Sequence, residues 1–256
     1  MDAPIPLKKH LVELRRRLVI AAAAIAAGTV VGFVLTDLLW HVLAQPVAAT
    51  DTAARAAMIN FTTVSGAFDL RLQIAFTSGV VMSSPVWLYQ IFAFIVPGLR
   101  RRERLYALGF VGAAFPLFLL GGAAGWLVVP HMVDLMLGFV PDGNSALLDA
   151  RNYIDFVLKL ILITGVAFVV PVLMVFLNFV GVVSGRSLLA GWRWAVLAIA
   201  AFTAIATPAA DVLSMFLLAI PMVLLYVAAC GVALIHDRRA SARLELLVDG
   251  PPVTRI

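Results

Sequence analysis

Two glutamates could take part in recognition, because each lies among arginines. Glu13 lies in the run HLVELRRR that begins at His10, and Glu103 lies in the run RRRER that begins at Arg100. A carboxylate can accept two parallel N–H bonds from one guanidinium, and partial exclusion of water makes this contact stronger than an exposed ion pair. Each glutamate is therefore a candidate acceptor for an arginine of another molecule. The alternative, that each acid only neutralises its own neighbours, stays open on these residues alone.

No pattern in the sequence indicates catalysis. There is no glycine-rich phosphate loop followed by Lys and Ser or Thr, so no ATP site is expected. The four histidines are scattered without metal-ligand spacing, so no metal or cofactor is expected. Asp155 and Lys159 are four residues apart, which is typical of a structural ion pair on a helix rather than of a proton relay. We therefore expect no enzyme and no catalytic residue.

The composition places the chain in a membrane. Of its 256 residues 63% are hydrophobic and only 13% are charged, whereas soluble domains are about half apolar and a quarter charged. Disorder is excluded as well, because disordered chains have low hydrophobicity. Cys230 is the only cysteine, which excludes a disulfide-rich scaffold.

Six long uncharged runs predict six transmembrane helices, because about 18–20 apolar residues cross a hydrocarbon core of roughly 30 Å. The predicted spans are about residues 18–40, 70–98, 105–130, 153–183, 192–208 and 212–235. We expect residues 1–236 to form one all-α membrane domain and residues 237–256 to form a mobile cytosolic tail. The run after Arg17 has features of an export signal, but the five later spans favour a permanent helix.

The placement of lysine and arginine predicts the orientation of the chain, because these residues concentrate in cytosolic loops. With the N-terminus inside, fifteen of the 19 basic residues fall on the cytosolic side. Both termini are therefore expected in the cytosol. The net charge of +5 then reflects membrane topology, and no nucleic acid is expected as a partner.

Pairs of glycines four residues apart predict close helix crossings, because small residues allow two backbones to approach. We expect these crossings to lie within one chain rather than between two copies. The pairs are Gly28 with Gly32, Gly121 with Gly125, and Gly181 with Gly185.

Several segments between about residues 7 and 235 form a distributed set of motifs. They are His10-Leu11-x-Glu13-Leu14-Arg15-x-Arg17, Ser84-Pro85, Leu88-Tyr89-Gln90, Phe92-Ala93-Phe94-Ile95, Pro97-Gly98-Leu99, Glu103-Arg104, Gly165-Val166-x-Phe168, Val170-Pro171-Val172, Thr207-Pro208, Asp211-Val212 and Leu217–Met222. This set resembles the TatC family, the multispanning receptor of twin-arginine protein export.

The resemblance implies a glove-shaped bundle of six helices in the bacterial cytoplasmic membrane, which binds the signal peptides of folded cargo proteins. It implies that the two acids for the twin arginines are Glu13 and Glu103. It implies further positions of the recognition surface at Arg15, Arg17, Phe94 and Pro97. It implies structural positions in the outer cap and the last helical hairpin at Pro46, Phe68 and Asp211.

The partners implied by the resemblance are single-span TatA and TatB-like proteins, with transport driven by the proton-motive force. Twin-arginine signal peptides, membrane lipids and further copies of this chain complete the expected assembly. Two positions depart from the family pattern: Val169 stands where a glutamate is common, and Met215 stands where many members have glutamine. We therefore expect the small partners to contact mainly the short last two helices around Thr207, through apolar packing.

Two other functions stay open on the residues alone. A six-span transporter of small solutes would need a polar site near the membrane midplane, commonly at interrupted helices related by a repeat. Neither a repeat nor such a site is visible in the sequence. A purely structural membrane scaffold is the second alternative.

Overall fold

The protein is described by a computed structural model that covers residues 7–49, 57–95, 101–141, 146–207 and 211–248, with side chains described for 11–48, 58–94, 108–141, 146–207 and 211–241. Its elements are, in chain order, α1 (Leu7–Val34), α2 (Thr36–Ala49), β1 (Ala57–Asn60), α3 (Gly66–Met82), α4 (Ser84–Ile95), α5 (Arg101–Leu137), β2 (Ala146–Asp149), α6 (Ala150–Phe179), α7 (Gly185–Ala190), α8 (Trp192–Ala206) and α9 (Val212–Val248).

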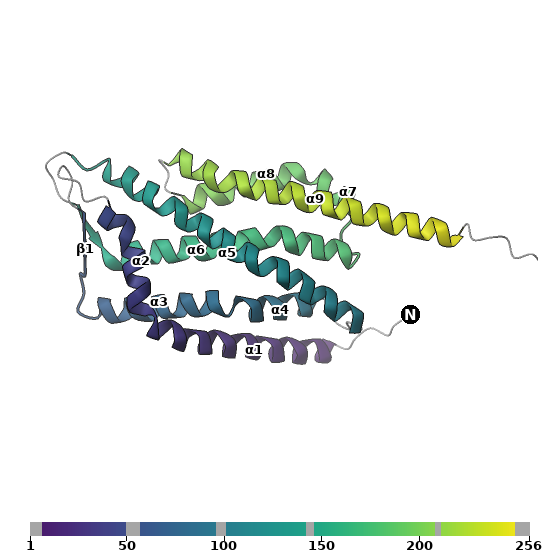
Figure 1. Cartoon of the computed structure of the whole chain (residues 1–256), viewed down its shortest axis with the longest axis horizontal. Helices are drawn as coiled ribbons and strands as arrows, with labels where there is room; N and C mark the ends of the chain where they lie inside the picture. Colours follow the sequence, from purple (N-terminus) through teal and green to yellow (C-terminus); the bar gives the residue numbers. More distant parts are fainter. Residues whose placement is uncertain (1–6, 50–56, 96–100, 142–145, 208–210, 249–256) are drawn as a thin grey trace, which may run out of the picture.

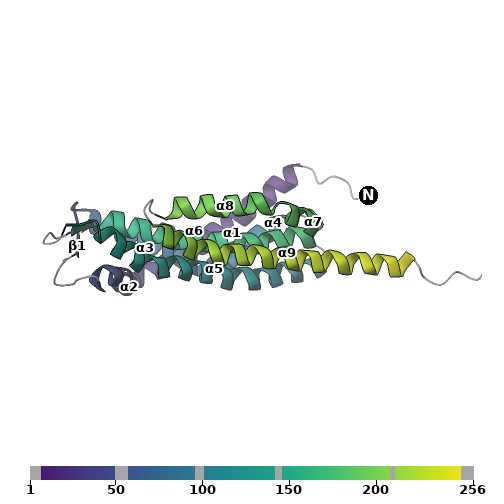
Figure 2. The same ribbon diagram turned by 90° about the horizontal axis from the view of Figure 1, so that it is seen from above.

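The long helices lie side by side along the long axis of the molecule (Figure 1). α5 packs along α6, α1 packs along α3, and α9 packs against α6 and α8. Both views place the start of α1 and the end of α9 at one end of the bundle, and the strands at the other (Figures 1 and 2). The bundle therefore has two distinct ends, which we call the terminal end and the strand end.

Within the described part of the chain, four helices are long and apolar enough to cross a membrane: Leu11–Val34, Leu108–Leu137, Ala150–Phe179 and Val212–Ser241. α8, with 15 residues, is shorter. The second predicted span is divided into α3 and α4 at Ser83, whose carbonyl accepts from the N–H groups of Val86 and Trp87. The break has a local cause, because Pro85 has no N–H group to continue the ladder.

The last helix is longer than the sequence analysis expected. Residues 237–256 were expected to form a mobile cytosolic tail, and the structure shows that α9 continues through part of this segment to Val248. After Arg239 the helix contains mainly alanine and leucine, with Arg243 and Glu245, and these residue types are strong helix formers. The hydrophobic pattern marks where the apolar run ends, whereas helix propensity decides how far the helix continues.

Two short strands of four residues each accompany the helices of this otherwise helical membrane protein, and the sequence analysis did not predict them. β1 follows α2, β2 precedes α6, and the two pair in parallel with Ala57 opposite Ala146 and Asn60 opposite Asp149. Asp149 also caps α6, because its side chain accepts a hydrogen bond from the backbone N–H of Arg151 at 3.3 Å. The strand pair therefore joins the two connections at the strand end.

The predicted close helix crossings are present for two of the three glycine pairs. A Cβ atom on Gly28 would lie 2.7 Å from the carbonyl oxygen of Gly79, and one on Gly121 would lie 2.6 Å from that of Thr164. These pairs join α1 to α3 and α5 to α6, so the crossings lie within one chain as expected. In the third pair only Gly185 packs closely, against α9.

Gly181 has a different role from the other glycines of these pairs. It has a φ of 82°, a left-handed conformation that suits glycine, and it follows the last turn of α6.

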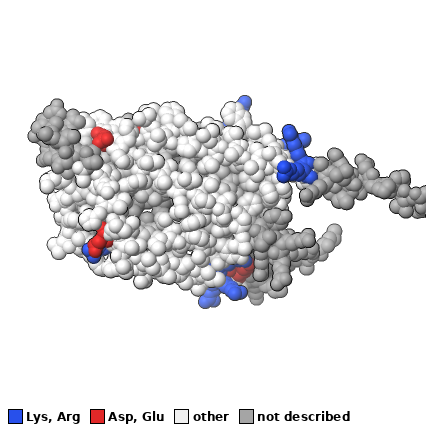
Figure 3. Space-filling model, viewed as in Figure 1, with Lys and Arg blue, Asp and Glu red and all other residues white. Residues whose placement is uncertain are grey.

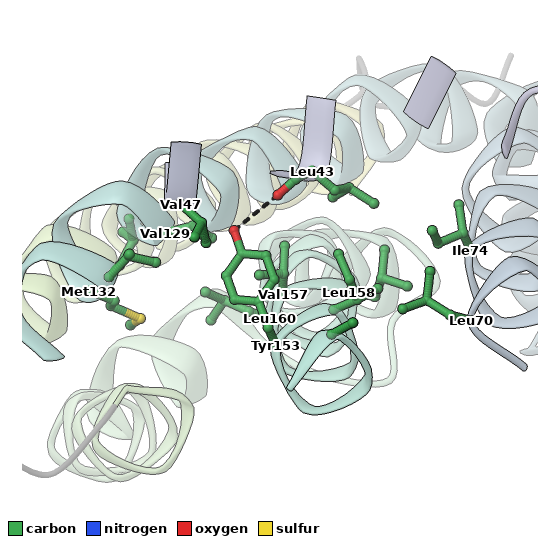
Figure 4. Close-up of a cluster of buried hydrophobic side chains, with 14 of the residues drawn as sticks. Leu43, Val47, Leu70, Ile74, Val129, Met132, Tyr153, Val157, Leu158 and Leu160 are labelled. Atoms are coloured by element: carbon green, nitrogen blue, oxygen red, sulfur yellow. Dashed lines mark hydrogen bonds between the residues drawn. The ribbon is translucent and has the colours of Figure 1, made fainter. Parts of the chain in front are cut away.

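A large hydrophobic cluster lies in the half of the bundle toward the strands and joins α2, α3, α5 and α6 (Figure 4). Ile74, Val129 and Met132 are among its buried side chains. The hydroxyl of Tyr153, in the first turn of α6, donates to the backbone carbonyl of Leu43 at 2.9 Å. This bond anchors α2 to the start of α6.

Candidate functional site

Glu13 lies in the second turn of α1 at the terminal end and is paired with Arg17, one turn later. The Nε and Nη2 atoms of Arg17 donate to one carboxylate oxygen of Glu13 at 3.1 and 2.5 Å. The pair is half-buried, with 37% of the Glu13 side chain and 21% of the Arg17 side chain exposed. A carboxylate in such a position is accessible to a ligand and is less screened by water than a fully exposed one.

Arg17 also connects α1 to α4. Its Nη1 atom lies 3.5 Å from the side-chain oxygen of Gln90, a long hydrogen bond between the two helices. Gln90 is four residues before Phe94, so the two lie on the same face of α4. Gln90 was not predicted as a functional residue, although it lies in one of the motifs on which the family resemblance rests.

The other residues of the predicted recognition surface are described only in part. Arg15 is exposed on α1, and Phe94 is half-buried near the end of α4. Glu103 lies in the first turn of α5, but its side chain is outside the described residues, as is the whole of Pro97. The structure thus brings Glu13 and Arg17 together and places them beside α4, just before the connection that leads to Glu103.

Basic side chains gather at the terminal end of the bundle, as the space-filling view shows (Figure 3). Arg193 lies over the ring of Trp192 at 5.7 Å from its centroid, a cation–π contact at the start of α8. The exposed arginines in the segment after α6 and in the second half of α9 are Arg186, Arg193, Arg238 and Arg239. This excess of positive charge at one end matches the basic face that the sequence predicted.

A polar cluster that the sequence analysis missed joins α6, α7 and α9 at the same end. Asp237 accepts hydrogen bonds from the side-chain amide of Asn178 at 2.8 Å and from the backbone N–H of Gly185 at 2.6 Å. His236 stacks on Phe179 with ring centroids 3.9 Å apart. The cluster therefore holds the last helix against the end of α6.

Asp211 caps the start of α9 near the strand end. Its Oδ1 atom accepts from the backbone N–H of Ser214 at 2.9 Å, and its side chain is fully buried. The Oδ2 atom of Asp211 and the hydroxyl of Ser214 have no hydrogen-bond partner among the described residues. The Nε2 atom of His131 lies 3.8 Å from Oδ1. The carboxylate of Asp211 thus holds the first turn of α9.

The residues predicted to contact partners are not gathered at one place. Thr207 is buried at the end of α8, where its hydroxyl donates to the carbonyl of Thr203 at 2.9 Å. Met215 is half-buried in the first turn of α9. Val169 is half-buried and packs against the cluster of α4, α5 and α6 that contains Phe92. These three side chains share no described contact.

The outer residues of the sequence analysis lie on α2, α3 and α6. Pro46 is buried within α2, and Phe68 is exposed in the first turn of α3. The predicted ion pair on α6 is formed, with Lys159 and Asp155 2.5 Å apart, and Gln73 of α3 donates to the same carboxylate at 2.6 Å. The pair thus links two helices, which is the structural role expected of it.

Together the helices and charged ends define a multispanning helical membrane protein with an acid–arginine site at its basic end. The profile of one protein family, described as the Sec-independent protein translocase protein (TatC), matches residues 9–221. The chain belongs to the TatC family, as the motifs in its sequence indicated. It is therefore a transport protein of the membrane and not an enzyme.

Similar proteins support the family over nearly the whole chain. A TatC protein of Xylanimonas cellulosilytica is 46% identical over 239 residues, which cover 93% of this chain and 87% of that protein. A TatC protein of Rothia mucilaginosa is 34% identical over 97% of this chain and 86% of its own length. A crystal structure described as the twin arginine translocase receptor TatC matches with a TM-score of 0.72 and 28% identity, covering 88% of this chain and 99% of that one.

Proposed function

We propose that the protein is the receptor and core subunit of twin-arginine translocation, and that it binds the twin-arginine signal peptides of folded proteins. The observation that carries the proposal is the half-buried carboxylate of Glu13, which already holds a guanidinium in the structure. A group that binds the guanidinium of Arg17 has the chemistry needed to bind that of a signal peptide. The membership of the TatC family supplies the transport context.

The proposed site extends from Glu13 across α4 to the start of α5. Gln90 and Phe94 line the face of α4 next to the Glu13–Arg17 pair, and Glu103 follows in the first turn of α5. Two carboxylates provide one acceptor for each arginine of the signal. The surrounding basic residues keep the site in the headgroup region, where lipids exclude part of the water.

In the proposed topology the chain crosses the bacterial cytoplasmic membrane six times in a glove-shaped bundle, with both termini in the cytosol. The four long helices give four spans, α3 and α4 together give a fifth, and α8 gives the sixth. α8 has 15 residues, about 22 Å at 1.5 Å per residue, less than the roughly 30 Å of a hydrocarbon core. The membrane should therefore be thinner beside α8.

That thinning supports a contact of single-span TatA and TatB-like partners with α8 and α9, in transport driven by the proton-motive force. Val169 and Met215 offer apolar surface rather than polar contacts to a partner helix. Reporter fusions test the topology: fusions after Asp51 and Gly143 should lie outside, and fusions after Arg102 and Arg239 in the cytosol. A cytosolic reporter at Gly143 would contradict the six-span arrangement.

Binding of a labelled twin-arginine peptide to the receptor in nanodiscs tests the recognition site. Glu13→Ala and Glu103→Ala should each remove a charge-assisted contact of about 1.5–3 kcal/mol, which corresponds to about tenfold to a hundredfold in affinity. Asp134→Ala is the matched control, because Asp134 is an exposed acid toward the other end of α5. If the double variant of Glu13 and Glu103 binds the peptide like the wild type, the assignment of the site is wrong.

A further inference from the structure

Glu13 is occupied in the structure by an arginine of the same helix. Both contacts of Arg17 go to the same carboxylate oxygen, and the third nitrogen of the guanidinium faces Gln90 of α4. A signal arginine would bring an identical group to the same carboxylate. A fork-to-fork contact needs one N–H group on each carboxylate oxygen, and Oε1 of Glu13 already accepts two N–H groups from Arg17.

We infer that Arg17 is an internal competitor of the signal peptide, which the signal arginine displaces from Glu13 when it binds. This inference rests on the proposed function, because it concerns the occupancy of the same site. The pair of Glu13 and Arg17 is then the resting form of the receptor. Its opening is a cost for every ligand that needs both carboxylate oxygens of Glu13.

The structure provides a second acceptor for the displaced guanidinium. The side-chain oxygen of Gln90 lies 3.5 Å from Arg17, so a small rotation of the arginine toward α4 would shorten this contact while Glu13 is released. α1 is loosely packed at this level, since Leu11, Val12, Leu14 and Leu18 are exposed by 40% or more. The exchange therefore needs no rearrangement of a packed core.

The competition has a specific energetic signature. A signal arginine needs both carboxylate oxygens for its fork and must displace Arg17, whereas a lysine ammonium can bind Oε2, which accepts no described hydrogen bond. The competitor thus lowers the affinity for a twin-arginine peptide more than the affinity for a twin-lysine peptide.

The test is a set of peptide-binding measurements in nanodiscs with Arg17→Gln. Partly exposed pairs contribute little, so the variant should bind the twin-arginine peptide about two- to fivefold more tightly and the twin-lysine peptide with a smaller gain. Arg16→Gln is the matched control: it removes the same charge from the next residue, which is exposed and makes no described contact with Glu13. Arg16→Gln should give a smaller gain than Arg17→Gln. Arg17→Lys, which keeps the charge but not the fork, should fall between wild type and Arg17→Gln.

A second background separates the inference from the proposed function. With Glu13→Ala already in place, Arg17→Gln should have no further effect, because the competitor has lost its acceptor. If Glu13→Ala weakens binding but Arg17→Gln gives no more gain than Arg16→Gln, or a loss, then Arg17 does not compete and the inference is overturned. If Glu13→Ala itself leaves binding unchanged, the proposed recognition site fails first.

Discussion

The crossing of α1 and α3 gives the most direct prediction of stability. Gly28→Ala would place a Cβ atom 2.7 Å from the carbonyl oxygen and 3.0 Å from the Cα atom of Gly79, and ordinary contact begins only at 3.4 Å. The obstructing atoms belong to the backbone, so neither can turn away as a side chain would. The two helices must therefore separate by roughly the missing distance, about 0.7 Å.

The expected cost of Gly28→Ala is about 1–3 kcal/mol, the usual range for an overfilled, well-packed contact. We expect the packing of α1 to be affected most. Only 6% of its apolar segment is buried inside the protein, and α3 is the main helix that it contacts. For a chain of this size each kcal/mol corresponds to roughly 2–4 °C in melting temperature. The variant should therefore melt at least a few degrees below the wild type.

The assay is thermal unfolding of the purified protein in one detergent, with Gly112→Ala as the control. A Cβ atom at Gly112 would meet no atom within 4 Å, although the change of residue type is the same and the site also lies in a long membrane helix. Gly112→Ala should melt at or above the wild-type temperature. Equal melting temperatures for the two variants would refute the argument that the crossing depends on a bare backbone at Gly28.

Three further predictions concern single side chains. Asp211→Asn keeps the oxygen that caps α9 whereas Asp211→Ala removes it, so the alanine variant should be about 0.5–2 kcal/mol less stable than the asparagine variant in denaturant titrations. Asp237→Ala removes the acceptor of the hydrogen bonds from Asn178 and Gly185, so its melting temperature should fall below that of the wild type, and an unchanged melting temperature would contradict this. Val169→Glu adds a carboxylate that costs about 2.5–3.5 kcal/mol at a helix centre. It should leave peptide binding unchanged and at most lower transport modestly; a strong rise in transport with native partners would show that a polar contact is needed there.

The sequence was informative wherever a local pattern decides the structure. Uncharged runs located the membrane helices, and glycine pairs at a spacing of four identified the crossings at Gly28 and Gly121, because both depend on residues close in the chain. The charge pattern around Glu13 left two interpretations open, and the structure shows Glu13 paired with Arg17 of its own helix, as in the interpretation that the acid neutralises a neighbour. Binding of an arginine from another molecule stays a prediction.

Features that depend on distant residues were not predictable in this way. The hydrogen bonds of Asp237 join Asn178 and Gly185, which are brought to it by the packing of α6 and α7 on α9. No pattern in the sequence around Asn178 predicts that contact. The strand pair was missed for the same reason, since each strand has only four residues and finds its partner in the other outer connection.

The strand pair has a consequence for how the molecule is made. β1 leaves the ribosome before α3, but its hydrogen-bond partner β2 follows only after α5, so the ladder between Ala57 and Ala146 cannot form until most of the chain has been synthesised. Contacts between such distant segments form slowly, because a long loop must close first. Newly inserted helices would thus remain adjustable at this end during biogenesis. Closure of the ladder would then be a late event that reports correct insertion of every helix between its two strands.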